Sequence, residues 1–277
     1  MTESKSMMPS TEIGVAAADR VVVLMYHRVG DAVNDWERRF CVEPSRFAAH
    51  MNALRDHGYR AVEIDRFAAW LAGDAQLPAG SFLLTFDDGF RGVYDHARPV
   101  LLKLGWPATV FLVSQRIGGE DVWDEGHNPA RRRHRLLDRA QIEQMQREGF
   151  SFQSHSRVHA DLTTLDDPQL AEELDGSRSD IEHLVGAPVR HLAFPYGRFD
   201  ARVQHAARSA RYRCAFSTKP GFNRPGRDAF EVLRLEVEGG DTSAALLRKM
   251  RLGSNDGSVA GAVRYALSRV PARLGLK

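Results

Sequence analysis

The chain has 277 residues, of which 43% are hydrophobic and 27% charged, and its formal net charge is +2. This length is sufficient for one large domain with a buried core, and the near-neutral charge gives no indication of a nucleic-acid partner. The two cysteines, Cys41 and Cys214, do not make a disulfide framework.

Taken in chain order, the sequence begins with a polar segment. Residues 1–19 are polar and predict a disordered leader. We expect no signal peptide, because no basic stretch is followed by an apolar one there. The run VVVLMY at 21–26 predicts a buried strand, since it is apolar without alternation. Further strands are expected at 61–64, 82–86, 108–113, 150–154, 190–194, 213–217 and 231–237. Helices are expected at 45–57, 65–72, 93–104, 138–148, 168–185, 200–210 and 241–251.

This alternation of strands and helices predicts a parallel α/β architecture, either an open sheet or a barrel. We see no linker, so residues 20–255 are expected to form one domain. Residues 256–277 are basic and predict either a closing helix or an amphipathic segment on anionic lipid. No apolar stretch reaches the length of a membrane span. The sequence therefore predicts a cytoplasmic protein, with peripheral contact with the inner membrane left open.

Polar side chains follow several of the predicted strands directly. Functional groups of parallel α/β folds gather at the carboxyl ends of the strands, so these residues are expected to share one end of the scaffold. They are His27, Asp87 with Asp88, His155 with His159, and Tyr196 in the Pro-Tyr-Gly sequence.

The two histidines predict a metal site together with the aspartate pair. His155 and His159 are four residues apart, so a helical turn or a tight loop places both imidazoles on one side. Two imidazoles and one carboxylate are a suitable ligand set for a divalent transition metal. One aspartate can then ligate the metal, whose charge offsets the repulsion between the carboxylates. The other aspartate is positioned to act as a general base on water.

Three motifs resemble the signature of the polysaccharide deacetylases, also called the NodB-homology or carbohydrate esterase family 4 group. They are TFDDG at 85–89, HSRVH at 155–159 and FPYG at 194–197. The resemblance extends from MYHRV to VLRLEV, about four-fifths of the chain. It implies a single-domain distorted (β/α)7 barrel that removes N- or O-acetyl groups from sugar polymers. It also implies a divalent transition metal, most commonly Zn²⁺, with Co²⁺, Mn²⁺, Ni²⁺ or Fe²⁺ accepted.

The resemblance also assigns roles to individual residues. It makes Asp88, His155 and His159 the metal ligands, and Asp87 the general base. The backbone N–H of Tyr196 would stabilise the oxyanion, and its side chain would help to line the substrate groove.

The sequence departs from the family pattern in three places. Ala193 stands where better-known members carry an arginine that orients the base, no histidine follows His205 to act as the acid, and the last third lacks tryptophan. The form MYHRV, FPYG and STKPGFNRPG resembles the exopolysaccharide and cell-envelope branch. We expect Arg234 to replace the missing arginine and His27 to line the site. The alternatives are a surface arginine and a core histidine.

The leading interpretation is a metal-dependent hydrolase that removes an N-acetyl group from a sugar residue of an acetylated glycan or glycolipid. Two alternatives are a carbohydrate-binding pseudoenzyme and a deformylase of a lipid-linked amino sugar. A glycosyltransferase with a metal–nucleotide site is disfavoured, because such sites prefer oxygen ligands to imidazoles. Trp123 and Asp124 either contact sugar or anchor a loop. The sugar, the linkage and the oligomeric state stay open.

Overall fold

A computed structural model describes residues 17–123 and 126–268 of the chain. Within these residues, eight parallel strands form one sheet in the order β10, β1, β5, β6, β7, β8 and β9, with β4 paired to β5. The strands are β1 (Val22–Tyr26), β4 (Arg60–Ala61), β5 (Ser81–Phe86), β6 (Thr109–Leu112), β7 (Ser151–Ser154), β8 (His191–Ala193), β9 (Cys214–Phe216) and β10 (Leu235–Glu236).

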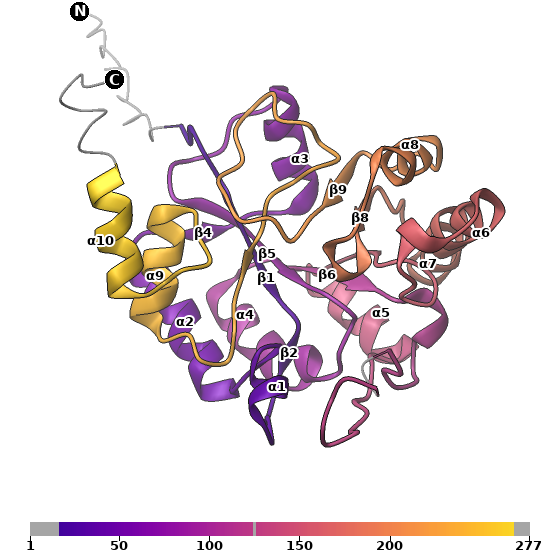
Figure 1. Cartoon of the computed structure of the whole chain (residues 1–277), viewed down its shortest axis with the longest axis horizontal. Coiled ribbons are helices and arrows are strands. Elements are labelled where there is room, and N and C mark those ends of the chain that lie inside the picture. Colours follow the sequence, from indigo (N-terminus) through magenta and orange to yellow (C-terminus); the bar gives the residue numbers. More distant parts are fainter. Residues whose placement is uncertain (1–16, 124–125, 269–277) are drawn as a thin grey trace, which may run out of the picture.

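The sheet curls until one stretch of chain reaches both of its edges. Val232 bridges in parallel to Phe216 of β9, and shortly after it Leu235 pairs with Leu24 of β1. The expected distorted barrel is therefore confirmed, with the helices arranged around the sheet (Figure 1). The strand expected over 231–237 is much shorter than predicted, because the chain changes partners in the middle of it.

Helices follow most of the strands and lie close to their expected positions. They are α2 (Pro44–Asp56), α3 (Ile64–Ala72), α4 (Arg98–Leu104), α5 (Arg139–Arg147), α6 (Asp167–Ala171), α7 (Ser177–Val185), α8 (Ala201–Ser209) and α9 (Ser243–Leu252). π-Helical turns at Val93–Ala97 and Glu172–Gly176 precede α4 and α7. The strand expected at 61–64 ends early, since Ile64 already begins α3.

A small unit after β1 has no counterpart in the predicted elements. Strands β2 (Arg28–Val29) and β3 (Cys41–Val42) pair in parallel, and helix α1 (Asp35–Arg38) lies between them in sequence. These elements are too short for a hydrophobic period to reveal them. They matter because they follow His27 and form one wall of the candidate site.

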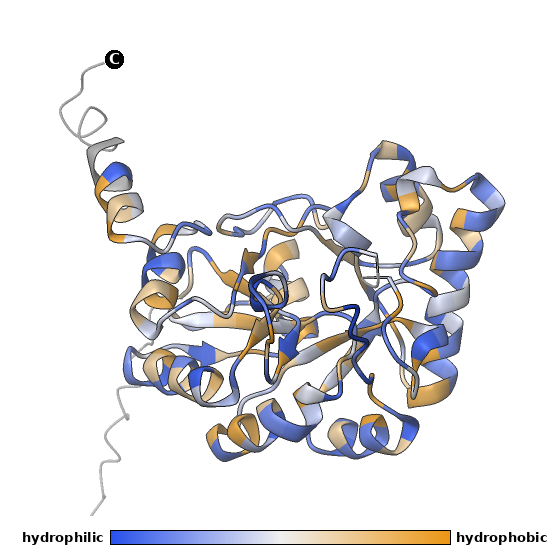
Figure 2. Ribbon diagram, turned by 60° about the horizontal axis from the view of Figure 1, so that its bottom comes forward, coloured by the Kyte–Doolittle hydropathy of each residue, from blue (hydrophilic) through white to orange (hydrophobic). Residues whose placement is uncertain are grey.

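Both faces of the sheet are buried, which explains the continuous apolar runs in the sequence. In β5, Leu84 belongs to the layer under the outer helices, whereas Leu83 belongs to a second layer with Phe111 and Phe216. Alternate residues of a strand point to opposite faces, so a strand covered on both sides has no polar face. Phe67 of α3 packs against Phe216 with ring centroids 6.2 Å apart and extends the second layer. Figure 2 shows the hydrophobic strands surrounded by helices whose other faces are hydrophilic.

The first described residues of the chain contact the body of the protein. The backbone N–H of Ala18 donates to the carbonyl oxygen of Leu77 at 2.7 Å, and Trp70 Nε1 donates to the carbonyl of Ala18 at 3.2 Å. The other residues of the expected leader, 1–16, lie outside the described residues.

Helix α10 (Val259–Ser268) contacts α9 and extends away from the body of the protein (Figure 2). Val259 and Val263 are exposed on it, and residues 269–277 of the basic segment lie outside the described residues. None of the described helices combines the length and the hydropathy that crossing a membrane requires.

Gly92 approaches β2 so closely that a side chain would not fit. A Cβ atom at this position would lie 2.0 Å from the carbonyl oxygen of Val29, which is a backbone atom and has no rotamer to change. We expect Gly92→Ala to lower the free energy of unfolding by about 2 kcal/mol, as overpacking does in other cores. Chemical denaturation measures the change. Gly30→Ala is the control, because its Cβ would meet nothing within 4 Å. Equal stabilities of the two variants would contradict this packing.

Candidate active site

The two aspartates lie directly after β5 at the carboxyl end of the sheet. The backbone N–H of Asp87 donates to the carbonyl oxygen of Tyr26 at 2.9 Å and so extends the pairing with β1. Asp88 and Gly89 then have φ angles of 71° and 77°, which turn the chain sharply away from the strand. Both carboxylates are buried, with exposed fractions of 2% for Asp87 and 5% for Asp88. Each therefore needs its own compensating partner.

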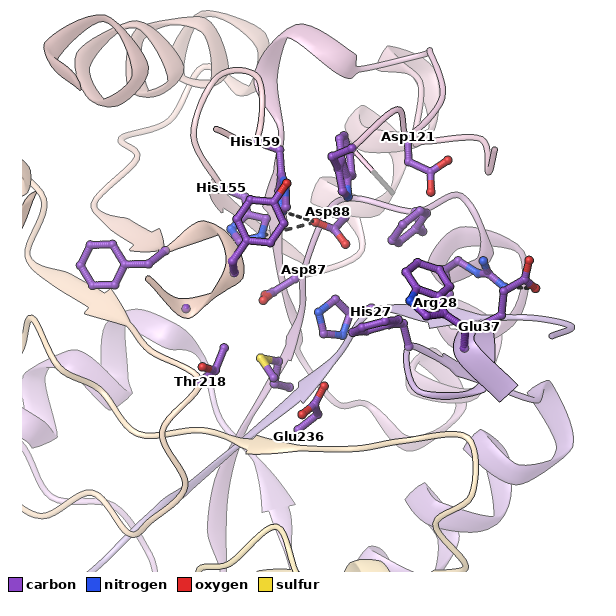
Figure 3. Close-up of a pocket in the computed structure, with 18 residues that line it drawn as sticks. His27, Arg28, Glu37, Asp87, Asp88, Asp121, His155, His159, Thr218 and Glu236 are labelled. Carbon is purple, nitrogen blue, oxygen red and sulfur yellow. Dashed lines mark hydrogen bonds and ion pairs between the residues drawn. The ribbon is translucent and has the colours of Figure 1, made fainter. Parts of the chain in front are cut away.

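Asp88 lies between the two histidines of the predicted metal site. Its Oδ1 atom is 3.4 Å from Nε2 of His155 and 3.3 Å from Nε2 of His159 (Figure 3). One ligand atom from each of the three residues lies within 4.8 Å of the others. Oδ1 is buried and accepts no hydrogen bond in the described part of the chain. A metal ion between these three atoms would satisfy that oxygen. The residues thus fit a divalent transition metal.

The loop after β7 presents the two imidazoles. Nδ1 of His155 donates to the carbonyl oxygen of Ala193 at 2.8 Å, which leaves the Nε2 lone pair facing Asp88. His159 has a φ angle of 66°, so the four-residue spacing is realised by a tight loop and not by a helical turn. Glu173 holds this loop, because its carboxylate accepts hydrogen bonds from the backbone N–H groups of residues 157–158 at 2.8 and 3.1 Å.

The ring of His159 is held by packing. Its Nδ1 atom is buried and has no hydrogen-bond partner among the described residues. Trp123 stacks on the ring with centroids 4.5 Å apart and an interplanar angle of 24°, and Tyr196 meets it edge-on, also at 4.5 Å. Burial lowers the pKa of His159 below its ordinary value, which favours the neutral form that ligates metals. Asp124, the neighbour of Trp123 in the sequence prediction, lies outside the described residues.

Arg234 pairs with Asp87 through two parallel hydrogen bonds. Nη1 and Nη2 donate to the two carboxylate oxygens at 2.7 and 2.8 Å, and Nε donates to the carbonyl oxygen of Ser217 at 2.8 Å. The guanidinium is fully buried, so it is not a surface arginine. Burial alone would raise the pKa of Asp87, but the Arg234 charge and then His155 outweigh it and hold that pKa below its ordinary value. Asp87 is therefore an anion at neutral pH.

The two aspartates and the two histidines line a cavity of about 270 Å³. His27 lines it directly after β1, and its Nδ1 atom is buried without a hydrogen-bond partner among the described residues. Its ring packs edge-on against Phe40 with centroids 5.4 Å apart. Tyr196 lies at the rim with 47% of its surface exposed and a φ angle of 57°. The cavity thus contains every site residue expected from the sequence except Arg234, which contacts it through Asp87.

The sequence interpretation missed an ion pair at one end of the cavity. Glu37 of α1 is fully buried and accepts hydrogen bonds from Asn128 at 2.9 Å and from Arg28 at 3.4 Å. Arg28 and Glu37 both line the cavity. No sequence motif predicts this pair, because the two residues meet only through the fold of the short unit of β2, α1 and β3.

Two further carboxylates of the cavity were also missed. Burial raises the pKa of Asp121 to about 6, against the hydrogen bond from the backbone N–H of His134, and the charge of Asp88 adds to the rise. Glu236 lies in β10, two residues after Arg234. Strand alternation was a usable signal for Glu236, since residues two apart share a face.

Comparison with known proteins identifies the family of the chain. Residues 74–215 match the family model described as polysaccharide deacetylase. The poly-β-1,6-N-acetyl-D-glucosamine N-deacetylase of Staphylococcus epidermidis is 27% identical over 239 residues, which cover 78% of each chain. The structure of IcaB from Ammonifex degensii has a TM-score of 0.69 at 28% identity, covering 79% of this chain and 92% of its own.

A polysaccharide deacetylase structure from Bacillus cereus has a TM-score of 0.67 at 28% identity, covering 81% of this chain and 66% of its own. The family match spans about half of the chain and includes the aspartate pair and the histidine pair. On these grounds the chain belongs to the polysaccharide deacetylase family.

Proposed function

We propose that the protein is a metal-dependent hydrolase that removes the N-acetyl group from an amino sugar of a glycan or glycolipid. One observation carries the proposal: the ligand set of Asp88, His155 and His159 lies beside Asp87, whose carboxylate is held by the buried Arg234. The name of the Staphylococcus epidermidis relative supports a glycan of N-acetylglucosamine as the substrate class.

One carboxylate and two imidazoles form the proposed metal site. This donor set favours Zn²⁺, with Co²⁺, Mn²⁺, Ni²⁺ or Fe²⁺ as alternatives. When bound, such an ion supplies Lewis-acid polarisation of the acetyl carbonyl and lowers the pKa of water. His155 and His159 reach the site through Nε2, and the hydrogen bond to Ala193 fixes the tautomer of His155.

The remaining residues move protons and stabilise charge. Hydrolysis converts the acetamide and one water into acetate and an ammonium group. Asp87 takes a proton from the attacking water, because the two hydrogen bonds of Arg234 keep its carboxylate anionic and correctly oriented. We assign the oxyanion contact to the backbone N–H of Tyr196. His27 is our candidate for the acid that protonates the departing amine, since it is the cavity histidine outside the ligand set.

Several sequence predictions stay predictions. They are the domain limits at residues 20–255, the cytoplasmic location and the peripheral contact with a membrane surface.

The first test is acetate release by the metal-loaded protein. We expect acetate from an N-acetylglucosamine oligosaccharide and from an aryl acetate, and we expect its loss on chelation. Asp87→Asn removes the base, so kcat should fall by about 10²- to 10⁴-fold. Asp56→Asn, the same change at an exposed position, is the control and should keep wild-type turnover.

Other products would favour the alternative functions. Tight sugar binding without acetate release would favour the pseudoenzyme, and formate release from an N-formyl analogue would favour the deformylase. Nucleoside diphosphate release from a sugar nucleotide would favour the transferase.

The pH profile tests the role of Arg234. In Arg234→Ala, burial acts on Asp87 without the opposing charge, so the pKa of Asp87 should rise. The base works when deprotonated, and the acidic limb of kcat/KM should therefore move to higher pH. Arg234→Lys keeps the charge and should shift the limb less. A limb that stays in place in both variants would refute the assignment.

Metal affinity tests the stacking of Trp123 on His159. Trp123→Ala removes the contact that orients a ring without a hydrogen-bonded Nδ1, so we expect metal binding to weaken roughly tenfold. Trp123→Phe keeps an aromatic face and should stay close to wild type. Competition with a chromogenic chelator gives the affinity. Trp36→Ala changes a cavity tryptophan that packs on Phe40, and it is expected to bind metal normally. Equal affinities of Trp123→Ala and Trp36→Ala would contradict the role.

A further inference from the structure

Two of the carboxylates that line the cavity have no ion-pair partner among the described residues. Its lining includes five carboxylates: Glu37, Asp87, Asp88, Asp121 and Glu236. Three of them have cationic or metal-ligating partners. Glu37 pairs with Arg28, Asp87 pairs with Arg234, and Asp88 belongs to the ligand set. The other two have no ion pair among the described residues.

These two carboxylates lie at opposite ends of the cavity. Figure 3 shows Asp121 on the side of Asp88 and His159, and Glu236 beyond Asp87 and His27. They also differ in what they bind. Asp121 accepts a hydrogen bond from the backbone N–H of His134, so one of its oxygens is already used. The side chain of Glu236 makes no hydrogen bond within the described chain, which leaves its carboxylate available to a ligand.

Hydrogen bonds hold the backbone of Glu236 on both sides, so the position from which its side chain enters the cavity is fixed. Its N–H donates to Oδ1 of Asn255 at 2.9 Å, and its carbonyl oxygen accepts from Nζ of Lys249, also at 2.9 Å. Lys249 forms its ion pair with Asp241 at 2.6 Å, so the nearby ammonium is engaged elsewhere. Arg234, two residues earlier, is engaged by Asp87. No cation of this segment neutralises the Glu236 carboxylate.

A glycan bound in the cavity would displace water that hydrates the half-buried carboxylate of Glu236. Sugar hydroxyls replace part of the lost hydration, whereas a cation also compensates the charge. The chemistry of the proposed function itself produces such a cation, because each turnover leaves an ammonium group on the sugar chain. An amino sugar next to the reacting residue would then carry a charge opposite to that of Glu236.

We infer that Glu236 is a specificity-determining residue that binds the ammonium group of a de-N-acetylated sugar adjacent to the reacting one. The preferred substrate is then a partly de-N-acetylated glycan, and each product becomes a better substrate for the next turnover. This inference deepens the proposed function and rests on it for the catalytic consequence. The binding of an amino-sugar oligomer, however, requires no turnover.

The binding experiment uses the trisaccharide of β-1,6-linked glucosamine with three free amino groups. Calorimetry compares wild type with Glu236→Gln, which keeps a carbonyl oxygen for hydroxyl groups but loses the charge. We expect roughly tenfold weaker binding by this variant, the scale of a lost charged hydrogen bond. The wild-type affinity should also fall as salt is added. Glu238→Gln, the same change at an exposed residue that does not line the cavity, is the matched control and should bind like wild type.

The catalytic experiment compares two trisaccharides, one fully N-acetylated and one acetylated only at its central residue. Wild type should have the higher kcat/KM for the second, and Glu236→Gln should reduce the ratio of the two values towards one. Thermal unfolding of each variant verifies that the fold is intact. Wild-type binding and ratio in Glu236→Gln would overturn the inference. So would a loss of amine binding in Asp121→Asn but not in Glu236→Gln.

Failure of the inference is distinguishable from failure of the proposed function. Amine binding that depends on Glu236, without acetate release from any substrate, would support the ammonium contact and refute the proposed function. Acetate release that is indifferent to Glu236 would support the proposed function and refute the inference.

Discussion

Two adjacent buried carboxylates at the end of β5 are the constraint on which the site depends. Like charges this close persist in an apolar interior only when each has its own compensation. Asp87 has the guanidinium of Arg234, and Asp88 has a ligand set that fits a dication. Arg234 belongs to the stretch of chain that joins the two edges of the sheet. The segment that closes the barrel therefore also supplies the cation that keeps Asp87 ionised.

The backbone of the site is held in conformations that side chains rarely adopt. Six described residues other than glycine have positive φ, and four of them are Asp88, Ser156, His159 and Tyr196. Such conformations cost of order 1–3 kcal/mol each and persist where the surroundings over-determine them. Here the turns are held by partly buried hydrogen bonds, such as those from the loop backbone to Glu173. The concentration of strain at the ligands indicates a preorganised site.

The segment at β10 places two charged side chains near the site because residues two apart point to the same side. Arg234 and Glu236 share one face of the segment, and one contacts the proposed base while the other faces the cavity. Another wall comes from the unit around α1, where Glu37 forms ion pairs with both Arg28 and Arg132. In the cavity, Asp87 and Asp88 thus have partners for their negative charges, whereas Glu236 at the other end has no ion pair among the described residues. In our proposal, the same segment therefore contacts both the base and the part of the substrate that does not react.

The sequence alone determined the parallel α/β fold, the family and the polar groups at the strand ends, because apolar period and short motifs are local properties. It could not determine that the strand at 231–237 splits between two partners, or that Glu37 is buried with Arg28. The contact between Asp87 and Arg234 joins residues 147 positions apart. Which side chains meet at such separations depends on the register and closure of the whole sheet. Only the tertiary structure decides this, since those features result from packing contacts summed over the entire chain.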